Sequence, residues 1–278
     1  MSPQEAQAAG TVQRLDVACR VCGEPIRLPC LPGKFGPRPG AITCTACAEA
    51  NRRQREAQAR ETAETRRRAA LQAIRADLPG ALARCGVPLA WREADFGNMP
   101  DLPAGLVATV RAWADGPEGA FVLFGSPGSG KTWVAVAMLG RALCEGVYSP
   151  AAVRFIGERA YLDGLKAAFT REGATPAARC LPATDPRRVG LLVFDDLCST
   201  RATDWTTSEI AALVEDRYAQ GLPTIFTSNL EPDALGAALD GRILSRIAES
   251  RLMLQFPPRD LRTSGSLKAQ KHPPAFGG

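Results

Sequence analysis

The segment from Phe121 to Thr132 constrains the fold of this 278-residue chain more than any other part of it. It reads Phe-Val-Leu-Phe and then Gly-Ser-Pro-Gly-Ser-Gly-Lys-Thr, so a short apolar run leads into the pattern G-x-x-x-x-G-K-T. The glycines permit backbone angles that turn successive N–H groups inward around a phosphate. Apolar helix formers follow, and the N-terminus of the helix that they predict favours an anion. We therefore predict a nucleoside triphosphate site on a strand–loop–helix unit.

The residues of this loop have separate expected roles. Lys131 supplies a positive charge for the β- and γ-phosphates, and the hydroxyl of Thr132 ligates Mg²⁺. The expected nucleotide-binding set is Gly125, Ser126, Pro127, Gly128, Ser129, Gly130, Lys131, Thr132 and Trp133.

Composition limits what surrounds this site. The chain is long enough for one sizeable core and a small accessory module. No window approaches 18 uninterrupted apolar residues and the first ten residues are polar, so we expect neither a membrane span nor a signal peptide. Nine cysteines beside a nucleotide site favour a reducing cytoplasm, where paired cysteines bind metal or stay as thiols.

The net charge of +5 lies in the N-terminal part of the chain. Residues 1–80 hold thirteen Lys and Arg against eight Asp and Glu, whereas the remainder is balanced. This asymmetry favours contact with nucleic acid or an acidic partner, although a solvated charged helix accounts for it equally well.

Four regions follow from composition and periodicity. We expect a zinc-binding module over 1–50, a basic linker helix over 51–79, an ATPase domain over 80–262 and a disordered polar tail over 263–278. Within the ATPase domain, the expected strands are 121–124, 153–156, 190–194 and 224–227, and the expected helices are 131–145, 157–170 and 206–220. This alternation predicts an α/β fold, with a parallel sheet and helices on both faces.

Polar side chains follow two of these strands. Asp195 and Asp196 end the strand 190–194, and Asn229 follows the strand 224–227. Because the carboxyl ends of parallel strands meet in one crevice, we expect Asp195 to hold Mg²⁺, Asp196 to orient the attacking water and Asn229 to contact the γ-phosphate or the water. Asn229 also fits a plain turn before Pro232.

Two arginines, Arg242 and Arg246, share one face of a further expected helix. One of them is expected to reach the γ-phosphate of a neighbouring subunit. We favour Arg246, although a surface arginine can also be merely solvated.

A second site is indicated near the N-terminus. Cys19 and Cys22 form one C-x₂-C pair and Cys44 and Cys47 another, with 21 residues between them. This spacing is typical of a structural Zn²⁺ site with four thiolates, and such a site has no open position for catalysis. Reduced or disulfide-paired cysteines are the alternative, and Cys30 is a spare that can replace one ligand.

The motifs at 125–132, 190–197, 223–230 and 241–247 together resemble those of the AAA+ ATPases of the DnaC/DnaI helicase-loader group. IstB-type transposition-helper ATPases share much of this set. The resemblance runs from about Cys85 to Arg262. It implies an ATPase that assembles as a ring or spiral around single-stranded DNA and delivers a DnaB-type helicase hexamer, with the zinc module docking on that helicase.

Asp196 departs from the Glu that AAA+ proteins generally carry at this position. Its shorter side chain predicts slow, switch-like ATP hydrolysis. The resemblance also implies DNA contacts in the segment from Arg154 and Phe155 to Arg171, through Arg159, Lys166 and Arg171 with Tyr161 and Phe169. The same segment fits an amphipathic helix with buried apolar residues and solvated charges.

Three functions remain open from the sequence. The first is an ATP-dependent loader of a replicative helicase onto single-stranded DNA. The second is an IstB-like transposition helper that binds duplex DNA, and the third is an adaptor that binds ATP without hydrolysing it.

Overall fold

The computed structural model describes residues 13–30, 42–99, 102–169, 185–239, 241–249, 252–258 and 260–261. The expected tail 263–278 and Arg171 lie outside these residues. The chain divides into two compact units, Met1–Ala69 and Ala70–Gly278. None of the helices within the described residues combines the length and the apolar character that crossing a membrane requires.

The N-terminal unit contains a two-stranded antiparallel ribbon. β1 (Gln13–Ala18) pairs with β2 (Pro25–Cys30), so that Gln13 faces Cys30 and Ala18 faces Pro25. The connecting turn is closed by the N–H of Cys19, which donates to the carbonyl of Glu24 at 2.8 Å. Gly23 has a φ of 77°, a value that glycine adopts without strain.

The helix α1 (Thr45–Ala76) runs across the boundary between the two units. It begins six residues before the predicted linker helix and therefore includes Cys47 in its first turn. Nearly all of its side chains are exposed, and Ile74 is its buried residue. The helix accordingly gains little from core packing before its last turns.

The second unit is built on a five-stranded sheet in which every pairing is parallel. The strand order is β4-β5-β6-β3-β7. The strands are β3 (Ala120–Phe124), β4 (Val153–Gly157), β5 (Leu191–Asp195), β6 (Thr224–Ser228) and β7 (Met253–Gln255). The predicted α/β fold with a parallel sheet is confirmed, and β7 is the strand that the sequence analysis did not identify.

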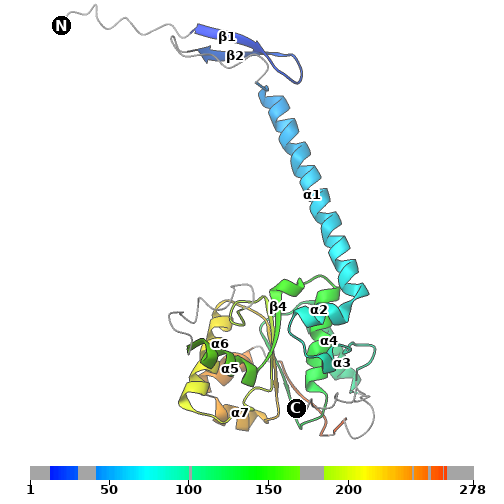
Figure 1. The fold of residues 1–278 in the computed structure, drawn as a ribbon, viewed down its shortest axis with the longest axis vertical. Helices are drawn as coiled ribbons and strands as arrows, with labels where there is room; N and C mark the ends of the chain where they lie inside the picture. The colour runs from blue at the N-terminus through cyan, green and yellow to red at the C-terminus, as the bar shows by residue number, and fades with distance from the viewer. Residues whose placement is uncertain are drawn as a thin grey trace, which may run out of the picture. The chain divides into compact units, whose positions relative to one another are not determined.

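Helices cover both faces of this sheet (Figure 1). On one face lie α2 (Leu78–Arg84), α3 (Ala104–Asp115) and α4 (Lys131–Cys144). On the other lie α5 (Glu158–Phe169), α6 (Asp204–Ala219), α7 (Pro232–Ala238) and α8 (Gly241–Glu249). Along β3, Phe121 and Leu123 join the first core whereas Val122 and Phe124 join the second, as the two-residue period of a strand requires.

Two short 3₁₀ turns complete the unit, η1 (Leu89–Trp91) and η2 (Pro150–Ala152). The segment between α2 and η1 covers the outer edge of the sheet at β4, because the N–H of Phe155 donates to the carbonyl of Cys85 at 2.8 Å. A fully buried arginine, Arg217, ties α6 to the starts of β5 and β6. Its guanidinium donates to Thr224 Oγ1 and to the carbonyls of Pro186, Val189 and Pro223 at 2.6 to 2.9 Å.

Candidate nucleotide and metal sites

The loop between β3 and α4 has the backbone geometry that a phosphate cradle needs. Gly125, Gly128 and Gly130 have φ values of 137°, 78° and 98°. Gly125 also has no room for a side chain, because a Cβ there would lie 3.0 Å from the carbonyl oxygen of Phe256. Two buried polar atoms of this region, Ser126 Oγ and Trp133 Nε1, have no hydrogen-bond partner among the described residues. Free donors beside a glycine cradle fit a polar ligand such as a nucleotide.

Lys131, at the start of α4, is almost completely buried. Its ammonium donates to the carbonyl oxygens of Gly125 at 2.9 Å and Ser126 at 2.8 Å, and to Oδ1 of Asn229 at 2.9 Å. The structure therefore brings Lys131 and Asn229 together, although they lie in different elements.

Asp195, the last residue of β5, lies beside Thr132. Oδ1 of Asp195 accepts hydrogen bonds from Thr132 Oγ1 at 2.8 Å and from Thr227 Oγ1 at 2.7 Å. Burial raises the pKa of Asp195 to about 6, opposed by these hydroxyl donors. The hydroxyl and carboxylate oxygens are hard ligands of the kind that Mg²⁺ prefers, so Thr132 and Asp195 fit the metal site that the sequence predicts. Thr227 was missed, since a threonine inside an apolar strand gives no distinctive signal.

Asp196 begins a tight turn that extends to Thr200. It has a φ of 58°, and its N–H donates to Thr227 Oγ1 at 2.9 Å. Asn229 Nδ2 lies 3.4 Å from Asp196 Oδ1. Lys131, Asp196 and Asn229 thus form one continuous polar group at the carboxyl ends of β5 and β6.

These side chains line a cavity of about 240 Å³. The lining residues are Trp91, Pro127, Gly128, Gly130, Lys131, Thr132, Trp133, Asp196 and Asn229. Trp91 belongs to η1, far from the loop in sequence, and packs its ring 6.0 Å from that of Phe155. The sequence analysis missed Trp91, because a lone tryptophan in an irregular segment has no spacing that marks it.

Arg246 does not lie at this cavity. It lines a separate apolar cavity of about 210 Å³ beside Gly119 and Thr224, which lie at the opposite ends of the strands. Its guanidinium pairs with Glu215 at 3.0 Å and stands 5.4 Å from the centre of the Tyr218 ring. A role at the nucleotide of the same chain is excluded by this placement, and the predicted role at a neighbour's nucleotide stays a prediction. The side chain of Arg242 lies outside the described ones.

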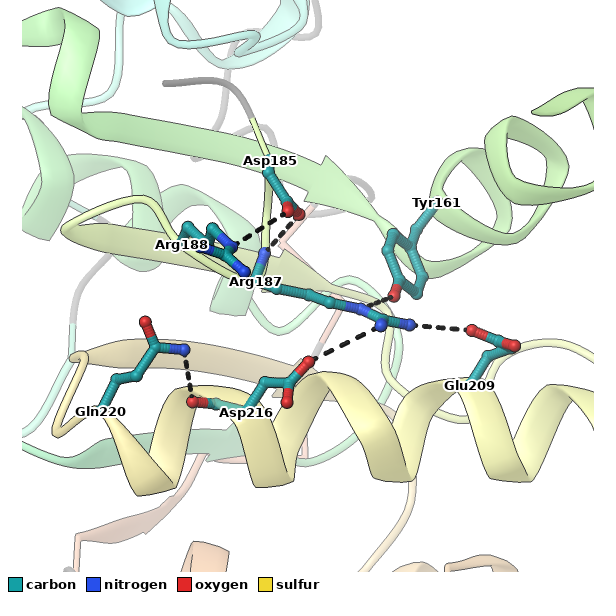
Figure 2. A network of polar contacts seen from close by, with 7 residues as sticks. All are labelled: Tyr161, Asp185, Arg187, Arg188, Glu209, Asp216 and Gln220. Atoms are coloured by element: carbon teal, nitrogen blue, oxygen red, sulfur yellow. Dashed lines mark hydrogen bonds and ion pairs between the residues drawn. The ribbon is translucent and has the colours of Figure 1, made fainter. Parts of the chain in front are cut away.

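One of the aromatic residues expected to contact DNA, Tyr161, is part of the core. Phe155 and Tyr161 are each 4% exposed. Tyr161 accepts a hydrogen bond from Arg187, which also reaches Glu209 and Asp216 of α6 (Figure 2). The expectation that Tyr161 contacts DNA is therefore wrong, because its ring is buried and packed against that of Phe194.

The charged residues of the same segment remain accessible. Arg159 is exposed and pairs with Asp163, and Lys166 stands over the ring of Trp205 at 5.3 Å. The side chain of Phe169 and all of Arg171 lie outside the described residues.

The four predicted cysteine ligands converge in the N-terminal unit. The sulfurs of Cys19, Cys22, Cys44 and Cys47 all lie within 4.8 Å of one another, with Cys22 and Cys44 at 3.7 Å. Four sulfurs that each lie about 2.3 Å from a tetrahedral Zn²⁺ are separated by about 3.8 Å. The observed spacing fits zinc, and these cysteines are free thiols rather than disulfides.

The ionisation of the cluster also favours a cation. Backbone N–H groups, that of Cys22 first, lower the pKa of Cys19 to about 6. Contact with the sulfur of Cys44 raises the pKa of Cys47 to about 12. Four thiolates cannot be held this close without a positive charge among them, so the donor set is compatible with a structural zinc ion.

The parallel sheet, its strand order and the cradle at the end of β3 define a P-loop ATPase of the AAA+ class. A comparison of the sequence with known families identifies the family within this class. The profile of the IstB-like ATP binding proteins matches residues 55–255, and the chain belongs to this family. A comparison with curated proteins finds no match.

Among solved structures, that of the DnaC helicase loader has a similar fold. The crystal structure of the DnaC helicase loader has a TM-score of 0.51 at 23% identity, with 59% of this chain and 97% of that chain covered. The crystal structure of DnaI has a TM-score of 0.49 at 19% identity, covering 61% and 93% of the two chains. The replication initiator DnaA bound to AMPPCP and single-stranded DNA has a TM-score of 0.48 at 18% identity, covering 60% and 50%.

Proposed function

We propose that this ATPase loads a replicative DnaB-type helicase hexamer onto single-stranded DNA. The observation that carries the proposal is the joining, in one chain, of a nucleotide site to a separate four-thiol cluster followed by an arginine-rich helix. A loader needs both parts, because the bound nucleotide must change the affinity of the protein for its partner. The basic helix adds charge suited to nucleic acid or to an acidic protein surface.

In this proposal the polar group at the ends of β5 and β6 hydrolyses ATP. Lys131 neutralises the phosphates, and Thr132 with Asp195 would hold Mg²⁺, which offsets the charge of the transferred phosphoryl group. Asp196 orients the attacking water and Asn229 contacts it or the γ-phosphate. Because Asp196 is one methylene shorter than glutamate, we expect slow turnover suited to a switch.

The four thiols serve a structural role. Cys19, Cys22, Cys44 and Cys47 would fill all four positions of a zinc ion, which leaves none for a substrate. Zinc then fixes the turn after β1 against the first turn of α1, and this surface docks on the helicase.

The test uses the full chain and the replicative helicase of the same organism. Co-sedimentation is measured with ATP, with ADP and without nucleotide. We expect a complex that depends on ATP, and its loss in Cys44→Ser and Cys47→Ser, with zinc content falling in parallel. Cys30→Ser serves as the matched control and should retain both zinc and helicase binding. Equal binding by all variants would contradict the docking role of the cluster.

A second candidate is an IstB-like transposition helper, which the family match favours. It predicts ATP-dependent filaments on double-stranded DNA in electron micrographs and no complex with a helicase. Single-stranded DNA binding by the full chain, without such filaments, would favour the loader instead.

A further inference from the structure

Glu158 is a buried carboxylate to which the nucleotide site gives no obvious role. It is the first residue of α5, directly after β4, and only 1% of it is exposed. No ion pair of the described residues involves Glu158, although an uncompensated buried carboxylate is strongly unfavourable. Its charge must therefore be stabilised by hydrogen bonds.

Among the described residues, the donors to the carboxylate of Glu158 come from the turn that follows Asp195 and Asp196. The N–H of Cys198 donates to Oε2, and the N–H of Thr200 donates to Oε1 at 3.0 Å. The hydroxyl of Thr200 donates to Oε1 as well. Donors to a charged acceptor form stronger hydrogen bonds than neutral pairs do, so this carboxylate and this turn stabilise each other.

The turn needs such support because its backbone is strained. Among the described residues, the non-glycine residues with a positive φ are Asp196 at 58° and Cys198 at 61°. Conformations of this kind persist only where surrounding contacts impose them, and they cluster at functional sites. Cys198 itself donates to Glu158, and Asp196 lies two residues before it.

The other side of the turn is held by β6. The N–H of Leu197 donates to the carbonyl of Thr227 at 2.8 Å, and Ser228 Oγ donates to the carbonyl of Leu197 at 2.9 Å. Hydrogen bonds therefore hold the turn to β6 on one side and to Glu158 on the other. The direction in which the Asp196 side chain leaves the backbone depends on both contacts.

We propose that Glu158 is a positioning residue that aims Asp196 at the nucleotide pocket by holding the turn from Asp196 to Thr200. This rests on the proposed role of Asp196 in ATP hydrolysis and is independent of helicase loading. Since Glu158 also begins α5, a displacement of that helix would move the turn with it.

The test compares steady-state ATP hydrolysis by the full chain and by Glu158→Gln. An amide cannot replace the carboxylate, because its NH₂ group would face an N–H donor of the turn. We expect kcat to fall by about 10- to 100-fold, since small misplacements of a catalytic group have effects of this size. KM for ATP should stay within about twofold, because Lys131 and Thr132 are untouched.

A double variant distinguishes a positioning role of Glu158 from a general loss of structure. If Glu158 acts through Asp196, adding Glu158→Gln to Asp196→Asn should cause no further loss of kcat. Independent losses that multiply would overturn the proposal. An unchanged kcat in Asp196→Asn would instead refute the role of Asp196, so the two failures are distinguishable.

Glu209→Gln is the matched control. Glu209 helps to anchor α5 through Arg187 and Tyr161 (Figure 2), and no hydrogen bond among the described residues joins its side chain to the turn. We expect it to lower the melting temperature without changing kcat. If Glu158→Gln does not fold, Thr200→Val removes one of the three bonds and should lower kcat several-fold at constant KM. A wild-type kcat in whichever of these two variants folds would overturn the proposal.

Discussion

Two tryptophans line the nucleotide cavity, and their places in the sequence differ. Trp133 directly follows the loop and leaves its indole N–H buried without a partner among the described residues. Trp91 comes from η1 and offers a half-exposed aromatic ring. An aromatic face beside a phosphate cradle suits the base of a nucleotide, because every base has a π-face on which to stack.

We predict that Trp91→Ala weakens binding of ATP by about 5- to 150-fold, which corresponds to the roughly 1–3 kcal/mol of base stacking. Inorganic tripolyphosphate, which has no base, should bind both proteins equally. Isothermal titration calorimetry with the two ligands measures this difference. Leu89→Ala, in the same turn and exposed, is the control. An equal loss for both ligands would mean that Trp91 merely supports the loop.

The raised pKa of Asp195 predicts that the free energy of unfolding depends on pH. Its pKa of about 6 in the folded chain lies above the ordinary value near 4, so the folded state binds this proton more tightly than the unfolded state. The resulting stabilisation is complete at low pH and is lost as pH rises from about 4 through about 6. Urea unfolding without nucleotide or Mg²⁺ should reveal this loss, and Asp195→Asn should not show it. Identical pH profiles would contradict the prediction.

Among the helices and strands, the sequence predicts those whose own residues form a clear pattern. The predicted strands 121–124, 153–156 and 224–227 each lie within an observed strand, and the predicted strand 190–194 begins one residue before β5. β7 is only three residues long, so its pattern was too short to identify. The helix 206–220 was predicted, but the start at Asp204 depends on Thr203, whose hydroxyl caps the backbone of Thr206.

The sequence likewise predicts only those residues of the nucleotide site that belong to a recognisable motif. Motif residues such as Lys131 and Asp195 were identified because their chemistry recurs at fixed spacing. Thr227 and Glu158 act through bonds that form only when β4, β5 and β6 lie side by side. Tyr161 was misassigned because a helix periodicity does not say which aromatic ring is covered by a neighbouring helix.

Arg217 is the side chain that holds α6 to the sheet, and its loss should destabilise the whole unit. Burial lowers the pKa of Arg217 to about 10, and its charge is stabilised by backbone carbonyls and a threonine hydroxyl. We predict that Arg217→Met lowers the free energy of unfolding by about 3 kcal/mol, as expected when hydrogen bonds to a buried charged group are lost. Chemical denaturation measures it, with the exposed Gln220→Ala as control. A change below about 0.5 kcal/mol would show that the carbonyls find other donors.

At the scale of the whole molecule, the position of Arg246 bears on assembly. Its placement at the opposite ends of the strands from the loop means that it can act on ATP only in another copy of the chain. We therefore expect ATP turnover per chain to rise with protein concentration.

We predict that Arg246→Ala lowers kcat by about 10³-fold without changing ATP affinity, since an arginine supplied in trans acts on the transition state. Glu215→Gln, which frees Arg246 from its partner in the same chain, should not lower kcat. Mixing Arg246→Ala with Lys131→Ala should restore turnover, because one subunit keeps the nucleotide site and the other keeps the arginine. No recovery on mixing would contradict action between subunits.

The contact between Lys131 and Asn229 has a consequence for nucleotide exchange. The ammonium of Lys131 donates to two backbone carbonyls and to the amide oxygen of Asn229. An arriving phosphate must replace these bonds, so the affinity for ATP is a difference between two sets of interactions rather than the sum of one. The same bonds of Lys131 can form again when the phosphate leaves. This exchange of partners lowers the net affinity for the nucleotide and so favours its release.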